Sequence, residues 1–226
     1  MKKQIKNIIF SDIFLLINGL IVVPFLSFAF LSLSPESPLY TSISRIAWVH
    51  NLWFATFVWA ILVMGVIILL TCSLARTGIT ETRTRSIFLT WQIISTIFTF
   101  VGCIMFPAKS GPDNIIFANY IHDYLTAIAW GMYVIGLVVY SIYIRKQNTL
   151  LGTIALGLIG YIIVTSIFFL IRVVDPSSYV GASAVSEVYI INILLLYLVV
   201  MNVLQNRMHY HTQKENQNLE CERSKK

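Results

Sequence analysis

Charged residues are scarce in this chain. They make up 12% of its 226 residues, and hydrophobic residues make up 57%, whereas ordinary soluble domains have about 25% and about 45–50%. With so few charges, a soluble fold would have to expose apolar side chains over most of its surface. The apolar residues also form long runs, and about 20 of them in a row cross the hydrocarbon core as a helix. The composition therefore excludes a soluble protein and predicts an integral membrane protein.

Most sequence signatures of chemistry are missing as well. The three cysteines (Cys72, Cys103 and Cys221) form no CxxC pair and have no zinc-like spacing. No Gly-rich phosphate loop, dinucleotide fingerprint or haem-attachment motif occurs. The net charge is +6, but no basic block interleaved with aromatic residues indicates nucleic-acid binding. We therefore expect no cofactor, no resident metal and no nucleic-acid partner.

The apolar runs predict an all-α bundle of six transmembrane helices. The bilayer core offers the backbone no water to bind, so each run must close its hydrogen bonds as a helix. The predicted spans are 8–33, 47–72, 87–107, 116–144, 149–173 and 185–204. The first run follows three lysines like a signal peptide, but it is too long for one, so we interpret it as a retained span. Pro24 should kink it.

The basic residues predict the orientation of the bundle. An even number of spans places both termini on one side, and all but three of the 16 Lys and Arg residues fall on that side. The exceptions are Arg45, Lys109 and Arg172. Positive residues mark the cytoplasmic face, so both termini are predicted to be cytoplasmic. Residues 205–226 form a polar cytoplasmic tail in this interpretation, with a frayed helix end followed by disorder.

Ionisable and amide side chains concentrate at the outer ends of the predicted helices. Such groups are costly at membrane depth, so each is a functional hypothesis. The candidate site residues are His50, Asn51, Asn119, His122, Asp123, Arg172 and Glu187. The inner halves offer little of this kind beyond Asp12 and Gln92. The distribution predicts a polar pocket that opens outward among spans two to six.

Three spans carry small or polar residues at helical spacing, which indicates faces that point into the bundle. The face on the fourth span consists of Asn119, His122, Thr126, Ala129, Tyr133, Gly136 and Tyr140. The face on the third span consists of Gln92, Ser95, Thr99 and Gly102. A third face, on the fifth span, consists of Thr153, Gly157 and Gly160, and we expect it to pack closely against a neighbour.

Catalytic chemistries remain open alternatives for the outer cluster. An intramembrane metal-dependent hydrolase needs three His or carboxylate ligands, and His50, His122, Asp123 and Glu187 are available. Adjacent helical residues project about 100° apart, however, which disfavours one ion shared by His122 and Asp123. A Ser–His–Asp arrangement lacks a nucleophile motif, and a haem between His50 and His122 lacks supporting residues.

A binding site without catalysis needs fewer assumptions. Arg172 and Glu187 flank the last outer loop and can form an ion pair across it. His122 and Asp123 would then offer hydrogen bonds to a head group or solute. This interpretation is the one we favour from the residues alone.

The order of several short motifs resembles a known family. They are residues 38–44 (PLYTSIS), Asn51, residues 102–107 (GCIMFP), His122 and Ser186-Glu187. This order, from the first span to the sixth, is similar to the bacterial six-helix membrane family called "domain of unknown function 998", related to the DRAM-like (damage-regulated autophagy modulator) proteins.

The resemblance has limited implications for residues and function. It would make Ser44, Phe106-Pro107, His122 and Glu187 the family positions, while Arg45 stands where a polar or acidic residue is common. It implies a membrane location without an established enzyme activity, and relatives linked to lipid distribution and membrane trafficking.

Taken together, the sequence predicts a non-enzymatic multi-pass protein of the bacterial inner membrane. Its partners would be membrane lipids or a small amphiphile in the outward pocket, with a role in lipid handling or in protection from membrane-active peptides. A solute-binding membrane subunit of a transporter is the alternative, and it would need a protein partner that the sequence does not identify. Small residues on the lipid-facing side of the first span would favour that alternative.

Overall fold

The computed structural model describes residues 13–35, 37–39, 42–105, 116–174 and 184–223. The side chains of residues 45, 48–49, 103–105, 116–121, 123, 168–174 and 211–223 lie outside this description. All the regular structure in the described ranges is helical. The fold class is therefore all-α, as predicted.

Most of the helices coincide with long apolar runs, and they continue through single glycines such as Gly65 and Gly157. A first helix, Ile13–Leu31, contains a π-helical turn η1 (Asn18–Val22) followed by α2 (Val23–Leu31). The others are α3 (Ile43–Val49), α4 (Trp53–Gly78), α5 (Thr82–Met105), α6 (Ile116–Gln147), α7 (Thr149–Val174) and α8 (Ala184–Arg223).

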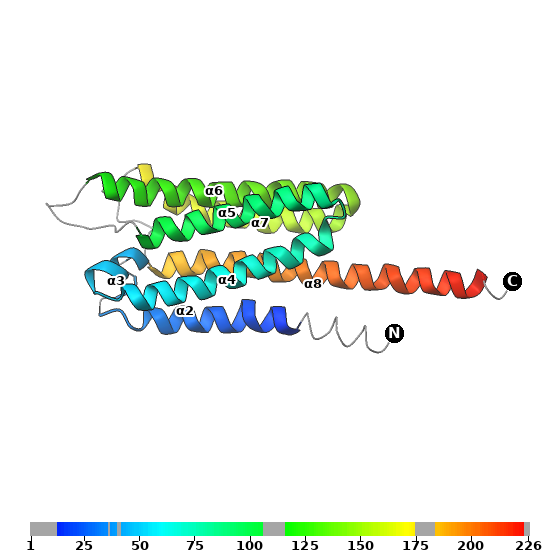
Figure 1. The fold of residues 1–226 in the computed structure, drawn as a ribbon, viewed down its shortest axis with the longest axis horizontal. Helices are drawn as coiled ribbons and strands as arrows, with labels where there is room; N and C mark the ends of the chain where they lie inside the picture. Colours follow the sequence, from blue (N-terminus) through cyan, green and yellow to red (C-terminus); the bar gives the residue numbers. More distant parts are fainter. Residues whose placement is uncertain (1–12, 36, 40–41, 106–115, 175–183, 224–226) are drawn as a thin grey trace.

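Five helical segments in the described part are long and apolar enough to cross a membrane. They are Ile13–Leu31, Trp53–Gly78, Tyr124–Gln147, Thr149–Ile167 and Ala184–Tyr210. The chain thus has the architecture of a multi-pass membrane protein. The remaining predicted span, 87–107, corresponds to α5, which runs alongside the others but begins with a polar turn containing Arg83 and Arg85 (Figure 1).

The long helices form a closed ring. Each packs against the next in the order α2, α4, α5, α6, α7 and α8, and α8 returns to η1 and α2 (Figure 1). Helices α4 and α8 also touch across the ring. Large apolar side chains fill the interior, among them Leu70, Leu137 and Leu198, which are fully buried. In a membrane bundle, close van der Waals packing of such side chains favours the association of the helices.

The two ends of the ring differ in charge. The basic end carries all the Lys and Arg side chains that the structure describes: Arg76, Arg83, Arg85, Arg145, Lys146 and Arg207. The opposite end, here called the α3 end, carries α3, the start of α6 and the start of α8 (Figure 1). The start of the first helix and the C-terminal part of α8 lie toward the basic end (Figure 1).

The second predicted span, 47–72, is displaced in the structure. A separate short helix, α3, ends at Val49, and the long helix begins at Trp53. Between them Asn51 has a φ of 56°, a left-handed conformation that Asn tolerates better than most residues. His50 and Asn51 therefore lie in a sharp bend before α4, not in its first turn as the apolar run suggested.

The end of α8 also differs from the prediction. Residues 205–223 continue the helix to Arg223, where the sequence suggested fraying and disorder. Their lack of apolar periodicity predicts disorder, but about half of the segment consists of Gln, Lys, Glu, Leu and Arg, which have high helix propensity. No Gly or Pro interrupts it, so the helix propagates from the buried part.

Pro24 disturbs its helix in a specific way. It occupies the first turn of α2, directly after η1, and its nitrogen has no hydrogen to donate to the preceding turn. The π-helical turn absorbs this missing bond by widening the helix locally. Gly19 lies in that turn, where an added Cβ would overlap the side chain of Val199 on α8. The widened turn and the glycine together let the first helix approach α8.

Two of the three predicted inward faces are confirmed. On α6, Ala129, Tyr133, Gly136 and Tyr140 are buried, and so is His122. The α5 face is buried at Gln92, Ser95 and Gly102 and half-buried at Thr99.

The predicted inward face of α7 is wrong. Thr153 and Gly157 are exposed, and a Cβ added at Gly157 or Gly160 would meet no atom within 4 Å. The helix buries a different face, formed by Leu151, Ala155, Ile159, Ile162 and Ser166. Both faces have helical spacing, and the one with larger side chains packs inward because it fills more of the interior.

Candidate functional site

Glu187 joins two distant parts of the chain at the α3 end. Its Oε2 accepts a hydrogen bond of 2.9 Å from the backbone N–H of Ile43, 144 residues earlier. Ile43 is the first residue of α3, where helix N–H groups have no partner within the helix. A carboxylate is a good acceptor there because the helix dipole favours negative charge at this end. The first turn of α8 therefore holds α3 in place.

Other polar groups at this end are also buried. Ser42 and Ser44, on either side of Ile43, are 6% and 2% exposed, and their hydroxyls lie 3.1 Å apart. Next to Glu187 in the chain, the backbone N–H of Val185 donates to the carbonyl of Pro38 over 3.4 Å. His122, on the inward face of α6, is 9% exposed. Polar side chains from α3, α6 and α8 therefore point into the same end of the ring.

The remaining predicted site residues divide into two groups. His50 is half-buried and Asn51 is exposed, both in the bend between α3 and α4. Asn119 and Asp123 belong to α6 and Arg172 to α7, but their side chains lie outside the described residues. The predicted Arg172–Glu187 ion pair therefore stays a prediction. No group of three His, Cys, Asp or Glu side chains within the described ranges has the arrangement of a metal site.

The half of the ring nearer the basic end contains a second set of polar groups, which sequence analysis missed. The hydroxyls of Thr71 on α4 and Tyr133 on α6 lie 2.9 Å apart, and those of Ser141 on α6 and Tyr197 on α8 lie 3.1 Å apart. All four residues are at most 2% exposed. Each tyrosine crosses the interior of the ring to reach its partner, so both pairs connect helices that are not consecutive in the ring.

A third link lies closer to the basic end. The Gln205 amide of α8 donates to the Tyr140 hydroxyl, and its carbonyl oxygen accepts a 2.7 Å hydrogen bond from Thr77. The Tyr140 hydroxyl also donates to the carbonyl of Leu74 over 3.4 Å. Gly78 makes room for this arrangement, because an added Cβ would lie 2.6 Å from the Gln205 nitrogen and would overlap the Tyr140 hydroxyl.

Two fully buried amides complete this polar interior. Asn202 on α8 donates to the carbonyls of Leu70 and Leu198 at 3.0 and 2.7 Å. Gln92 on α5 is 0% exposed, and in the described part of the chain neither of its amide atoms has a hydrogen-bond partner. It lies against α6, where a Cβ on Gly136 would be 3.0 Å from its amide nitrogen. The interhelical polar set is defined as Thr71, Thr77, Tyr133, Tyr140, Ser141, Tyr197, Asn202 and Gln205.

The sequence did contain a signal for this set. The spacing of Tyr133, Gly136 and Tyr140 predicts one inward face of α6, and the two tyrosine hydroxyls on such a face need buried partners. Asn202 and Gln205 stand three apart at the end of an apolar run, which places both on one face of α8. Amides at that position need buried partners, because a lost hydrogen bond inside a membrane is costly.

Indole N–H groups tie neighbouring helices around the ring. Trp59 on α4 donates to the Ser27 hydroxyl of α2 over 3.0 Å, and Trp130 on α6 donates to the Ser166 hydroxyl of α7 over 2.9 Å. The Trp59 ring also stacks on Phe30, with 5.0 Å between ring centroids. These contacts position the helices that carry both polar regions.

Comparison with protein-family models, with curated proteins and with solved structures finds no match to this chain.

Proposed function

We propose that this protein is a non-enzymatic, six-span protein of the bacterial inner membrane that binds a lipid head group or small amphiphile at the α3 end. Membership of the six-helix family that the motifs resemble is part of the same proposal. The Glu187–Ile43 contact carries it. In the proposal, this contact holds the short helix α3 at the same end as the polar side chains that would bind the head group.

The chemistry of this end suits an amphiphile. The residues include hydroxyls at Ser42 and Ser44, an imidazole at His122 and a carboxylate at Glu187, so donors and acceptors are both available. Long apolar side chains surround the ring outside, among them Trp53 and Phe54 of α4, which are 52% and 65% exposed. A ligand with a polar head and an apolar tail can contact both kinds of surface.

The distribution of charge supports an outward orientation for this end. Every Lys and Arg side chain that the structure describes lies at the basic end, and positive residues mark the cytoplasmic face of bacterial membrane proteins. In the proposal, both termini are therefore cytoplasmic and the α3 end faces the outside. α5 serves as the remaining span, since it runs the length of the ring between α4 and α6.

The transporter alternative finds less support. A transporter subunit is expected to show small residues on the lipid-facing side of its first helix. The exposed side chains of that helix are instead mostly large, including Phe14, Ile21, Phe25 and Phe28. The metal-dependent hydrolase stays an alternative, since the side chain of Asp123, one of its candidate ligands, lies outside the described residues.

Photo-crosslinking of the reconstituted protein tests the proposal. We would use a phospholipid with a photoreactive head group and map the crosslinked residues by mass spectrometry. Crosslinks should concentrate at the α3 end, and His122→Ala and Glu187→Gln should each lower their yield about tenfold, the effect of losing one charged or buried hydrogen-bond partner. Glu187→Gln keeps an acceptor oxygen for Ile43, so this variant should retain the position of α3.

Thr165→Val provides the matched control. Thr165 is half-buried on α7, and its hydroxyl bonds only to carbonyls of its own helix, at Tyr161 and Ile162. It should leave the crosslinking yield unchanged. Equal yields from the wild type and from both site variants, with all three proteins folded, would overturn the assignment of a site to this end.

A further inference from the structure

The basic end carries an excess of positive charge beside α5 and α6. Arg83, Arg145 and Lys146 are exposed, and within the described part of the chain no ion pair joins them to an acidic side chain. Glu81 is the acidic side chain that the structure describes at this end, and its Oε2 accepts a 2.6 Å hydrogen bond from Thr84. These three cations are therefore accessible to an anion from outside the chain.

Contacts between α5 and α6 align two of these cations. Phe88 packs against Tyr140 with 5.2 Å between ring centroids, and Gln92 packs against Gly136. Each step of four residues along α5 thus matches a step of four back along α6, as expected for antiparallel helices. By the same register, Arg83 and Arg145, five residues beyond Phe88 and Tyr140, lie at the same height along the two helices. Two like charges therefore stand at one level of neighbouring helices.

The position of Arg83 is unfavourable for the helix itself. It lies in the first turn of α5, together with Arg85, and no acidic residue occurs in that turn. Cations at a helix N-terminus oppose the helix dipole and cost stability. Arg145 and Lys146 lie in the last turn of α6, where cations interact favourably with the helix dipole. The dipole therefore accounts for the positions of these two residues but not for the position of Arg83.

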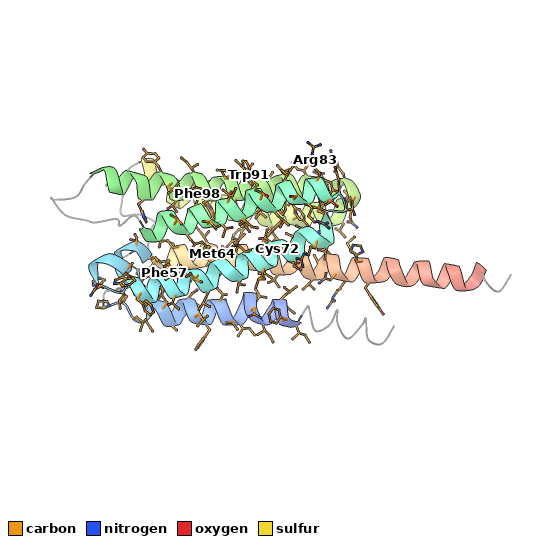
Figure 2. All side chains as sticks on the ribbon, in the orientation of Figure 1. Phe57, Met64, Cys72, Arg83, Trp91 and Phe98 are labelled. Atoms are coloured by element: carbon orange, nitrogen blue, oxygen red, sulfur yellow. The ribbon has the colours of Figure 1, made fainter. Side chains whose placement is uncertain are left out.

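An apolar track leads away from Arg83 along α5. Ile87, Trp91, Ile94 and Phe98 follow it at steps of four, four, three and four, and they are 61%, 40%, 43% and 48% exposed. Figure 2 shows Arg83, Trp91 and Phe98 in a row along one side of the bundle. The Trp91 indole donates to the carbonyl of Met132 on α6 over 2.7 Å, which fixes its ring across the seam between the two helices.

We propose that the α5–α6 seam at the basic end is a binding site for one anionic phospholipid. Arg83, Arg145 and Lys146 would hold its phosphate, and its acyl chains would lie along Ile87, Trp91, Ile94 and Phe98. Guanidinium groups bind phosphate with paired hydrogen bonds. The apolar track selects a lipid over a soluble anion, because a free phosphate uses only the cations. This site is separate from the one proposed at the α3 end and does not depend on it.

Native mass spectrometry of the full chain, with phosphatidylglycerol added in increasing amounts, tests this inference. Each basic residue near an anionic surface contributes about 1 kcal/mol, or about fivefold in affinity. The double variant R83Q/R145Q should therefore bind phosphatidylglycerol about 25-fold more weakly, while phosphatidylcholine binding stays the same. The charge-matched control is R76Q/R207Q, which removes two cations of the same end from α4 and α8, away from the seam.

The outcomes distinguish a local binding site at the seam from general electrostatic attraction to the basic end. A loss of less than about fivefold in R76Q/R207Q, beside the larger loss in R83Q/R145Q, supports the seam. Equal losses in the two variants would show general attraction to the basic end and would overturn the proposal. Trp91→Ala, which keeps every charge, should also weaken binding. If inorganic phosphate displaces the lipid at equal concentration, the apolar track has no role and the lipid assignment fails.

Discussion

At the α3 end a charged side chain, Glu187, binds the backbone of a seven-residue helix, whereas nearer the basic end neutral hydroxyls and amides bind one another between long helices. The first region depends on a helix that contributes little stability of its own, since an isolated helix this short is unstable in water. The second connects long helices through side chains that are buried in the interior of the ring. The comparison indicates that the α3 end can rearrange around a ligand at lower cost than the interior of the bundle can.

The largest expected effect concerns the orientation of the two ends. In a cysteine-free background, Leu39→Cys should react with a membrane-impermeant maleimide on intact cells, and Lys146→Cys only after permeabilisation. Leu39 is 61% exposed near α3, and Lys146 is exposed at the end of α6. On intact cells, labelling should be nearly complete for Leu39→Cys and nearly absent for Lys146→Cys. The reverse pattern would show that the bundle has the opposite orientation, and the proposed head-group site would then lie on the cytoplasmic face.

The next effect measures how tightly the interior is packed. Gly78→Ala should lower the free energy of unfolding by about 1–3 kcal/mol, because the added methyl group displaces Tyr140 and Gln205 from their hydrogen bonds. Gly157→Ala is the matched control. It lies on the exposed face of α7 with no atom within 4 Å of the new methyl, so it should raise stability by about 0.4–1 kcal/mol. Denaturation in mixed micelles measures both, and equal effects would contradict the packing around Gly78.

The smallest effect tests a single interhelical pair. Thr71→Val should cost about 0.6–1.7 kcal/mol, the range found for hydrogen bonds between membrane helices, because it leaves the Tyr133 hydroxyl without its partner. Tyr133→Phe should lower the free energy of unfolding less in the Thr71→Val variant than in the wild type. A double-mutant cycle measures the difference. Thr153→Val, whose hydroxyl bonds to its own helix at Thr149, should be close to neutral. Strict additivity of the first two changes would show that the pair contributes nothing.

Much of the helical architecture follows directly from sequence patterns. The long apolar runs locate α6, α7 and the start of α8 closely, because a run of this length has one stable structure in lipid. Asn148 illustrates a boundary that local chemistry fixes: its side chain accepts a hydrogen bond from the N–H of Leu151 and caps α7. The spacing of His122, Ala129, Tyr133 and Tyr140 likewise identifies the inward face of α6.

Other features depend on tertiary contacts that no pattern contains. The break between α3 and α4 occurs inside an apolar run, where a left-handed Asn51 interrupts the helix without any Gly or Pro beside it. α7 offered two faces with helical spacing, and only the shape of its neighbours selects the one with Ala155 and Ile159. The role of Glu187 was equally hidden, since its partner is a backbone group 144 residues away.

The length of α8 has a mechanical consequence. Its 40 residues correspond to about 60 Å, roughly twice the thickness of a hydrocarbon core of about 30 Å. The helix is held inside the ring by hydrogen bonds of Tyr197, Asn202 and Gln205, and its C-terminal arm extends beyond the basic end (Figure 1). From Gln205 onward the arm measures about 27 Å, so a 10° tilt of the bundle would move its tip by about 5 Å. A fluorophore at Arg223 would report such tilting directly.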